Sequence, residues 1–68
     1  MKSRTNKFGG TDYIGKNGVA RIAVVDCETH VHLFGEGMRV LLWTVTFSHS
    51  TPDFIIESVL NQAQSHIE

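Results

Sequence analysis

Cysteine, proline and long apolar segments are all scarce in this sequence, and these absences exclude several classes of protein. The single cysteine cannot form an intramolecular disulfide, which excludes small disulfide-stapled domains and favours a reducing compartment, the cytoplasm. No apolar run approaches the roughly 18 residues that a membrane-spanning helix needs. Charged residues make up 19% and apolar residues 41% of the chain, a composition typical of a folded protein rather than a disordered one.

The length of 68 residues leaves room for one small domain. A domain of this size buries only about 60% of the surface that its unfolded chain exposes, so its stability is marginal. Without disulfides, the remaining sources of stability are a structural metal, oligomerisation or very good packing. We expect residues 1–6 to form a flexible basic tail and residues 7–68 to form a single α+β domain.

Alternating and turn-forming residues predict an antiparallel β-meander of three to four strands. The first strand is expected at about residues 7–14, and the Asn-Gly pair that follows is a strong hairpin signal. Apolar and polar residues alternate through residues 19–34, which predicts either one long strand or two, bent near residues 26–28. The next strand is expected at about residues 38–48.

The last two segments are expected to pair across a tight turn at residues 35–37. A three-residue loop there sets the register, and both rows of bulky apolar side chains then fall on one face of the sheet. A slip of one residue would separate the two rows, so this agreement supports the pairing. The expected pairs are Val31–Leu41, Thr29–Trp43, Cys27–Val45 and Val25–Phe47.

An amphipathic helix is predicted at about residues 52–67. Ser50 or Thr51 supplies a hydroxyl that can cap the first amides, and Pro52 and Asp53 suit the first turn. Apolar residues then recur at helical spacing. We expect this helix to cover the sheet face that carries Leu41, Trp43, Val45 and Phe47.

The opposite face of the sheet is expected to stay exposed, because one helix cannot cover both faces. Exposed apolar patches beyond a few hundred Å² usually mark an interaction surface, so we predict a homodimer or a dedicated protein partner. Nearby acidic residues would affect the rate and selectivity of association with a basic partner. The predicted partner surface consists of Ile22, Val24, Phe34, Val40, Leu42, Phe54, Asp26 and Glu28.

These patterns predict a small non-enzymatic module of the regulator, adaptor or inhibitor type, which binds a partner protein and self-associates. We identify no catalytic residue, no cofactor and no small-molecule substrate. Ser48, His49 and Ser50 place hydroxyls beside an imidazole, but neighbouring strand residues face opposite sides and cannot form a nucleophile–base pair.

The uneven distribution of charge leaves nucleic-acid binding open as an alternative function. Residues 1–21 hold five bases against one acid, whereas residues 22–68 hold one base against six acids. A basic arm followed by a basic hairpin could contact phosphates. The bases concerned are Lys2, Arg4, Lys7, Lys16 and Arg21.

Metal binding through His30 and His32 is a second alternative. Residues two apart on a strand project to the same side, so these two imidazoles could share a metal ion. Cys27 is expected to point to the core, away from them. The predicted register places Leu42 and Val40 opposite the histidines, and neither residue is a ligand, so we expect no native metal.

Overall fold

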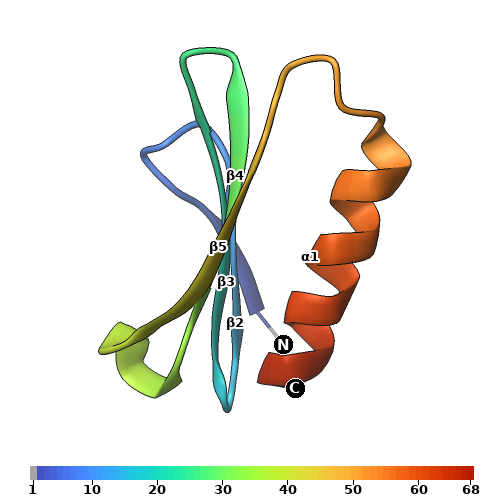
Figure 1. Ribbon diagram of the computed structural model, residues 1–68. Helices are drawn as coiled ribbons and strands as arrows, with labels where there is room; N and C mark the ends of the chain where they lie inside the picture. The colour runs from blue at the N-terminus through green and yellow to red at the C-terminus, as the bar shows by residue number, and fades with distance from the viewer. Residues whose placement is uncertain (1) are drawn as a thin grey trace.

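A five-stranded antiparallel sheet and one helix make up the protein, as Figure 1 shows. The computed structural model describes residues 2–68. Strands neighbouring in the chain are neighbours in the sheet, so the predicted α+β meander with a C-terminal helix is confirmed. The elements are β1 (Lys2–Thr5), β2 (Thr11–Gly15), β3 (Gly18–Val25), β4 (Glu28–Phe34), a 3₁₀ turn η1 (Glu36–Met38), β5 (Leu41–Phe47) and α1 (Asp53–Ile67).

Strand β1 lies where the sequence predicted a tail. Its residues are exposed and include two bases, so nothing in its composition marks it as a strand. It pairs antiparallel with β2, Lys2 opposite Ile14 and Thr5 opposite Thr11. The meander is therefore one strand longer than expected, and the sheet begins almost at the N-terminus.

The alternating segment 19–34 forms two strands joined by a two-residue turn. Asp26 and Cys27 occupy this turn with φ of 52° and 64°, the left-handed conformation that a tight hairpin needs. Even-numbered residues of β3 therefore share a face with odd-numbered residues of β4, for example Ala20 opposite Leu33. Of the two expected alternatives, two strands are confirmed and the single long strand is wrong; the bend near residues 26–28 is a complete reversal.

The predicted register between β4 and β5 is also wrong. Val31 pairs with Val45 and Leu33 with Trp43, whereas Val31 was expected opposite Leu41. The reason is the connection, which is a longer loop containing η1, closed by a hydrogen bond of 2.8 Å from Gly35 N to Val40 O. The remaining expected pairs, Thr29–Trp43, Cys27–Val45 and Val25–Phe47, fail with it. Over Thr29–Leu33 the shift is four residues, an even number, so Trp43, Val45 and Phe47 still share a face with the apolar row of β4. A bulge follows between Leu33 and Phe34. Leu41, expected on the same face, therefore pairs with Phe34 and lies on the other side of the sheet.

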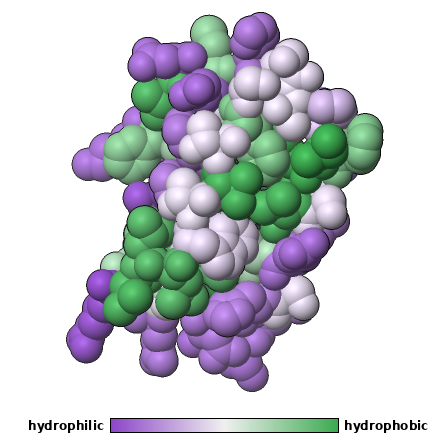
Figure 2. Space-filling view, in the orientation of Figure 1, coloured by the Kyte–Doolittle hydropathy of each residue, from purple (hydrophilic) through white to green (hydrophobic). Residues whose placement is uncertain are grey.

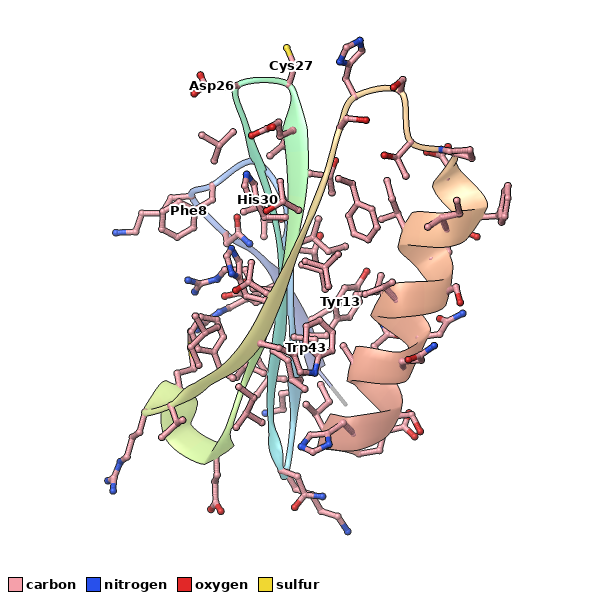
Figure 3. All side chains as sticks on the ribbon, in the orientation of Figure 1. Phe8, Tyr13, Asp26, Cys27, His30 and Trp43 are labelled. Atoms are coloured by element: carbon pink, nitrogen blue, oxygen red, sulfur yellow. The ribbon has the colours of Figure 1, made fainter. Side chains whose placement is uncertain are left out.

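Helix α1 packs against that shared face, mainly over β3 and less over β2 and β4. The core consists of Ala20, Leu33, Ala63 and Ile67, with Tyr13 and Trp43 packed against it. Figure 3 shows Tyr13 and Trp43 between sheet and helix. The small side chains of Ala20 and Ala63 let the helix approach the sheet closely, and β5 lies at the margin of the covered area.

Both ends of α1 differ from a simple capped helix. Pro52 is at the N-cap, and no side chain caps the first amides; Ser50 and Thr51 instead hydrogen-bond to Ser48. At the C-terminus, the Asn17 backbone N–H donates to Ile67 O at 3.0 Å, which fixes the helix to the β2–β3 turn.

Among residues 2–68, no helix has the length and apolar content needed to cross a bilayer.

Candidate functional site

The sheet face opposite α1 carries a groove of about 440 Å³. We call this side of the sheet the open face; in Figure 3 it lies on the left, where Phe8 and His30 project away from the helix. The groove is mostly apolar, as ligand and peptide sites usually are. Its walls come from β3, β4, the β1–β2 loop and the start of β5. The lining residues are Phe8, Arg21, Ala23, Val25, His30, His32, Phe34 and Leu41.

A buried ion pair beneath the open face holds Arg21 in place. Asp12 on β2 is 1% exposed and lies directly opposite Arg21 on β3. Arg21 donates from Nε to Oδ1 at 2.8 Å and from Nη2 to Oδ2 at 3.1 Å, a bidentate pair. The hydrogen bond from Arg21 is the main cause that holds the pKa of Asp12 below its ordinary value, and the same bond raises the pKa of Arg21. Arg4 lies 3.6 Å from the carboxylate and adds to the effect.

Asn6 connects this ion pair to the β1–β2 loop. Its Nδ2 donates to Asp12 Oδ1 and to Ile22 O, both at 2.9 Å. Its Oδ1 accepts from the backbone N–H groups of Phe8 at 2.8 Å and Gly10 at 3.1 Å. All the hydrogen-bonding atoms of this amide are therefore used, and the loop that carries Phe8 is fixed against the open face.

Two aromatic rings contact the guanidinium of Arg21. Its Cζ lies 5.0 Å from the ring centroid of Phe8 and 5.5 Å from that of Phe34, within the range of cation–π interactions. Arg21 thus positions two aromatic walls of the groove. Two of its five N–H donors, one on Nε and one on Nη2, are committed to Asp12, so its charge is already compensated within the fold.

His30 and His32 form a stacked pair on the open face. Their rings are 3° from parallel with centroids 5.9 Å apart. Each Nδ1 is hydrogen-bonded to a threonine on β5, His32 to Thr44 at 2.8 Å and His30 to Thr46 at 3.0 Å. Burial is the main cause that lowers the pKa of His32, and the charges of His30 and Arg21 lower it further. His32 therefore presents a neutral ring at neutral pH.

The structure changes the surroundings expected for these histidines. Thr44 and Thr46, rather than Val40 and Leu42, lie opposite them on β5. Cys27 is exposed in the β3–β4 turn and does not point to the core. Within residues 2–68, no group of three or more His, Cys, Asp or Glu side chains is arranged to hold a metal ion.

The residues predicted as a partner surface are distributed over several parts of the molecule. Phe34 lines the groove. Ile22 and Val24 do not lie on the open face, because the Asp26–Cys27 turn puts them on the helix-facing side of β3; Ile22 is opposite the buried Val31. Four others are exposed but outside the groove: Val40, Leu42, Asp26 and Glu28. Phe54, 71% exposed, is on the first turn of α1.

The five bases considered for nucleic-acid binding are also divided. Lys2 and Arg4 lie on β1, an edge of the sheet, and Lys7 is exposed in the loop that follows. Lys16 lies in the β2–β3 turn, near the end of α1. Arg21 is paired with Asp12 and partly covered by aromatic rings. Arg4, Lys7 and Arg21 nevertheless line one hollow beside Asp12, and the Asp12 carboxylate compensates part of their charge.

Sequence reasoning missed Phe8, Ala23, Val25 and Leu41 as lining residues of the groove. One feature of the sequence did indicate the Asp12–Arg21 ion pair of the open face. Asp12 is three residues before Gly15 and Arg21 is three after Gly18, so the recognised Asn-Gly hairpin places them opposite each other. An acid and a base at paired strand positions indicate an ion pair on one face of the sheet.

Known proteins give no further guide to the function. No protein-family model, no curated protein and no solved structure matches this chain.

Proposed function

We propose that this protein is a small non-enzymatic interaction module that binds a partner protein through the open face and that self-associates. The observation that carries the proposal is that α1 covers one face of the sheet, while the other face holds an apolar groove. Phe8, Val25 and Leu41 line this groove and are 43%, 47% and 52% exposed. Apolar side chains exposed this far, in a formed concavity, favour a binding surface.

The partner expected at this surface is a protein segment with one or more apolar side chains. The groove offers aromatic and aliphatic walls at Phe8, Phe34 and Val25, held by the Arg21 network. A pre-organised wall loses little conformational freedom on binding, which favours affinity. The lone cysteine is consistent with an action in the cytoplasm, which is part of this proposal.

The geometry favours a protein partner over nucleic acid. Arg21, the most central base of the open face, already satisfies Asp12, and Arg4 lies beside the same carboxylate. Phosphate recognition needs cations whose charge is free to displace counterions. Apolar side chains form the greater part of the groove wall instead.

A pair of neighbouring valines tests the proposal. Val24 and Val25 are both 47% exposed and adjacent on β3, but only Val25 lies in the groove. We expect the tagged full-length protein to capture a specific protein from the cells that make it, and Val25→Glu to lose that protein because a carboxylate cannot be desolvated against an apolar partner. Quantitative mass spectrometry of the captured material measures the loss.

Val24→Glu is the matched control, since it adds the same charge at the same exposure on the other side of the strand. It should retain the captured protein. Equal capture by both variants, or a loss with Val24→Glu alone, would show that the open face is not the binding surface.

A further inference from the structure

The two edges of the sheet differ in how well they are protected against pairing with another strand. Strand β1, at one edge, has four residues and two of them are bases. Strand β5, at the other edge, has seven residues, Leu41 to Phe47, and none is charged. Short length, charged side chains and bulges are among the devices that keep an edge strand from pairing. β5 is neither short nor charged, and its irregularity lies at the N-terminal end, between the Phe34–Leu41 and Leu33–Trp43 pairs, so Trp43–Phe47 pairs regularly with β4.

The backbone of β5 is free on its outer side. The strand pairs only with β4, and no backbone hydrogen bond from outside the sheet reaches Leu41–Phe47 within residues 2–68. Helix α1 packs mainly over β2, β3 and β4, and β5 meets the core beneath it through Trp43. Figure 1 shows β5 crossing in front of the other strands, and Figure 2 shows green and pale residues along its course.

Apolar side chains extend this edge at its N-terminal end. Val40, Leu41 and Leu42 are 58%, 52% and 46% exposed. A standard protein interface uses about 20–30 residues from each side, so a strand pair of seven residues needs such flanking side chains to be stable. The edge therefore combines unpaired backbone groups with adjacent apolar surface.

We infer that β5 pairs antiparallel with β5 of a second copy of this chain, which gives a two-fold dimer with one continuous ten-stranded sheet. This inference names the surface for the self-association proposed above and rests on that part of the proposed function. Two identical strands can meet here without repulsion, because β5 carries no charge. A two-fold axis at Thr44 sets Trp43 opposite the partner's Val45, an aromatic and β-branched pair of the kind that stabilises sheets.

Formation of the dimer would also bury more of the apolar side chains on the helix-facing side of β5. Trp43 and Val45 are only half-buried, because α1 lies over the neighbouring strands. Pairing places the same residues of the second copy beside them on the same face. The two open-face grooves then lie on the opposite side of one continuous sheet, so a dimer presents two binding sites in a fixed relation.

Charge at the centre of β5 tests this inference. Thr44 is exposed, and Thr44→Lys places like charges together across the two-fold axis, which disfavours pairing. Sedimentation equilibrium should show a dimer for the unaltered chain. For Thr44→Lys and for Thr44→Glu it should show weaker association, with the dimer Kd raised at least about tenfold, which is about 1.4 kcal/mol for each variant. An equimolar mixture of the two variants should recover the dimer, because the opposed charges then attract. Thr5→Lys, the same change on the β1 edge, should leave the dimer intact.

Oxidative cross-linking provides a second measurement that adds no charge. In a Cys27→Ser background, a single cysteine at position 44 should give a disulfide-linked dimer, and a mixture of chains with a cysteine at position 42 and chains with one at position 46 should cross-link to each other. A cysteine at position 42, 46 or 5 alone should not. Opposed strand residues have Cα atoms about 4.5–5.5 Å apart, within the range of a disulfide.

The possible outcomes separate this inference from the proposed function. A dimer that Thr44→Lys leaves unchanged while Val25→Glu dissociates it would overturn β5 pairing and retain self-association through the open face. A chain that stays monomeric at every concentration would overturn self-association altogether, while leaving partner capture by the groove to be judged on its own experiment. Failure of the mixed variants to associate would likewise contradict β5 pairing.

Discussion

At the scale of single residues, the open face depends on one buried carboxylate. Asp12 accepts hydrogen bonds from Arg21 and Asn6, and these two residues in turn fix Phe34 and the Phe8 loop. A carboxylate that is nearly inaccessible to water needs such partners, because burial without them is costly. The same interaction therefore stabilises the sheet and shapes the groove.

Replacement of Asp12 by asparagine should destabilise the fold. Asp12→Asn removes the charge opposite Arg21, whose side chain is still 19% exposed, so we expect a loss of about 2–3 kcal/mol, the cost of a charged hydrogen bond rather than of a fully buried ion. Urea unfolding measures it. Asp53→Asn, at an exposed position on the first turn of α1, should lose less than about 1 kcal/mol. Equal losses in the two variants would contradict the role given to Asp12.

His32 gives the stability a dependence on pH. Its pKa in the folded protein is lowered from 6.5, so below that pH the unfolded chain binds more protons than the folded one. The free energy of unfolding should therefore fall as the pH drops from 6.5 through the lowered pKa, and this contribution should be constant above 6.5. Unfolding experiments between about pH 8 and about pH 5 measure the slope.

His32→Asn is the control for this slope, because its side-chain amide can still reach Thr44 but does not titrate. The variant should lose less stability on acidification than the unaltered chain. An identical slope in both proteins would show that His32 does not carry the effect.

At the scale of elements, tight turns decided which predictions succeeded. The Asn-Gly pair after β2 marked its hairpin correctly, because glycine readily takes positive φ. Asp26 and Cys27 form an equally tight turn, but cysteine rarely adopts a left-handed conformation, so the pattern left one long strand and two strands both open. The misplaced face of Ile22 and Val24 follows from this one turn.

Cys27→Gly tests this explanation of the β3–β4 turn. Cys27 has φ of 64°, which costs an ordinary L-residue about 1–2 kcal/mol, whereas glycine adopts it freely. We expect Cys27→Gly to raise the thermal midpoint, with a gain approaching about 1 kcal/mol once the greater entropy of unfolded glycine is subtracted. Cys27→Ser should leave stability nearly unchanged. A fall in stability with glycine would contradict the left-handed turn.

The connection between β4 and β5 limited the sequence analysis in another way. Hydrophobic alternation identifies which residues share a face, and it did so for Val31, Leu33, Trp43 and Val45. Alternation has a period of two and cannot distinguish registers that differ by an even number of residues. The loop alone decides between them, and η1 with its left-handed Gly37 and Met38 has no simple sequence signature.

At the scale of the whole molecule, a single helix and a five-stranded sheet leave one face and one edge uncovered. The sequence predicted the uncovered face from size and amphipathicity, but the groove on it depends on side chains brought together by four connections. Phe8 illustrates this point, since its loop is held at that face by the Asn6 side chain and by a backbone hydrogen bond from Val24 N to Phe8 O. We propose a separate function for each uncovered surface: the open face binds a partner protein, and the β5 edge pairs with a second copy.

The most direct test of partner binding is the response of side-chain methyl groups on the two faces. The full-length protein, labelled in alanine and valine methyls, is titrated by NMR with the protein that it captures. We predict that Ala23 and Val25, in the groove, shift or broaden, whereas Val24 and Ala63, on the helix side, do not. Perturbation of Val24 and Ala63 with unchanged Ala23 and Val25 would contradict binding at the open face.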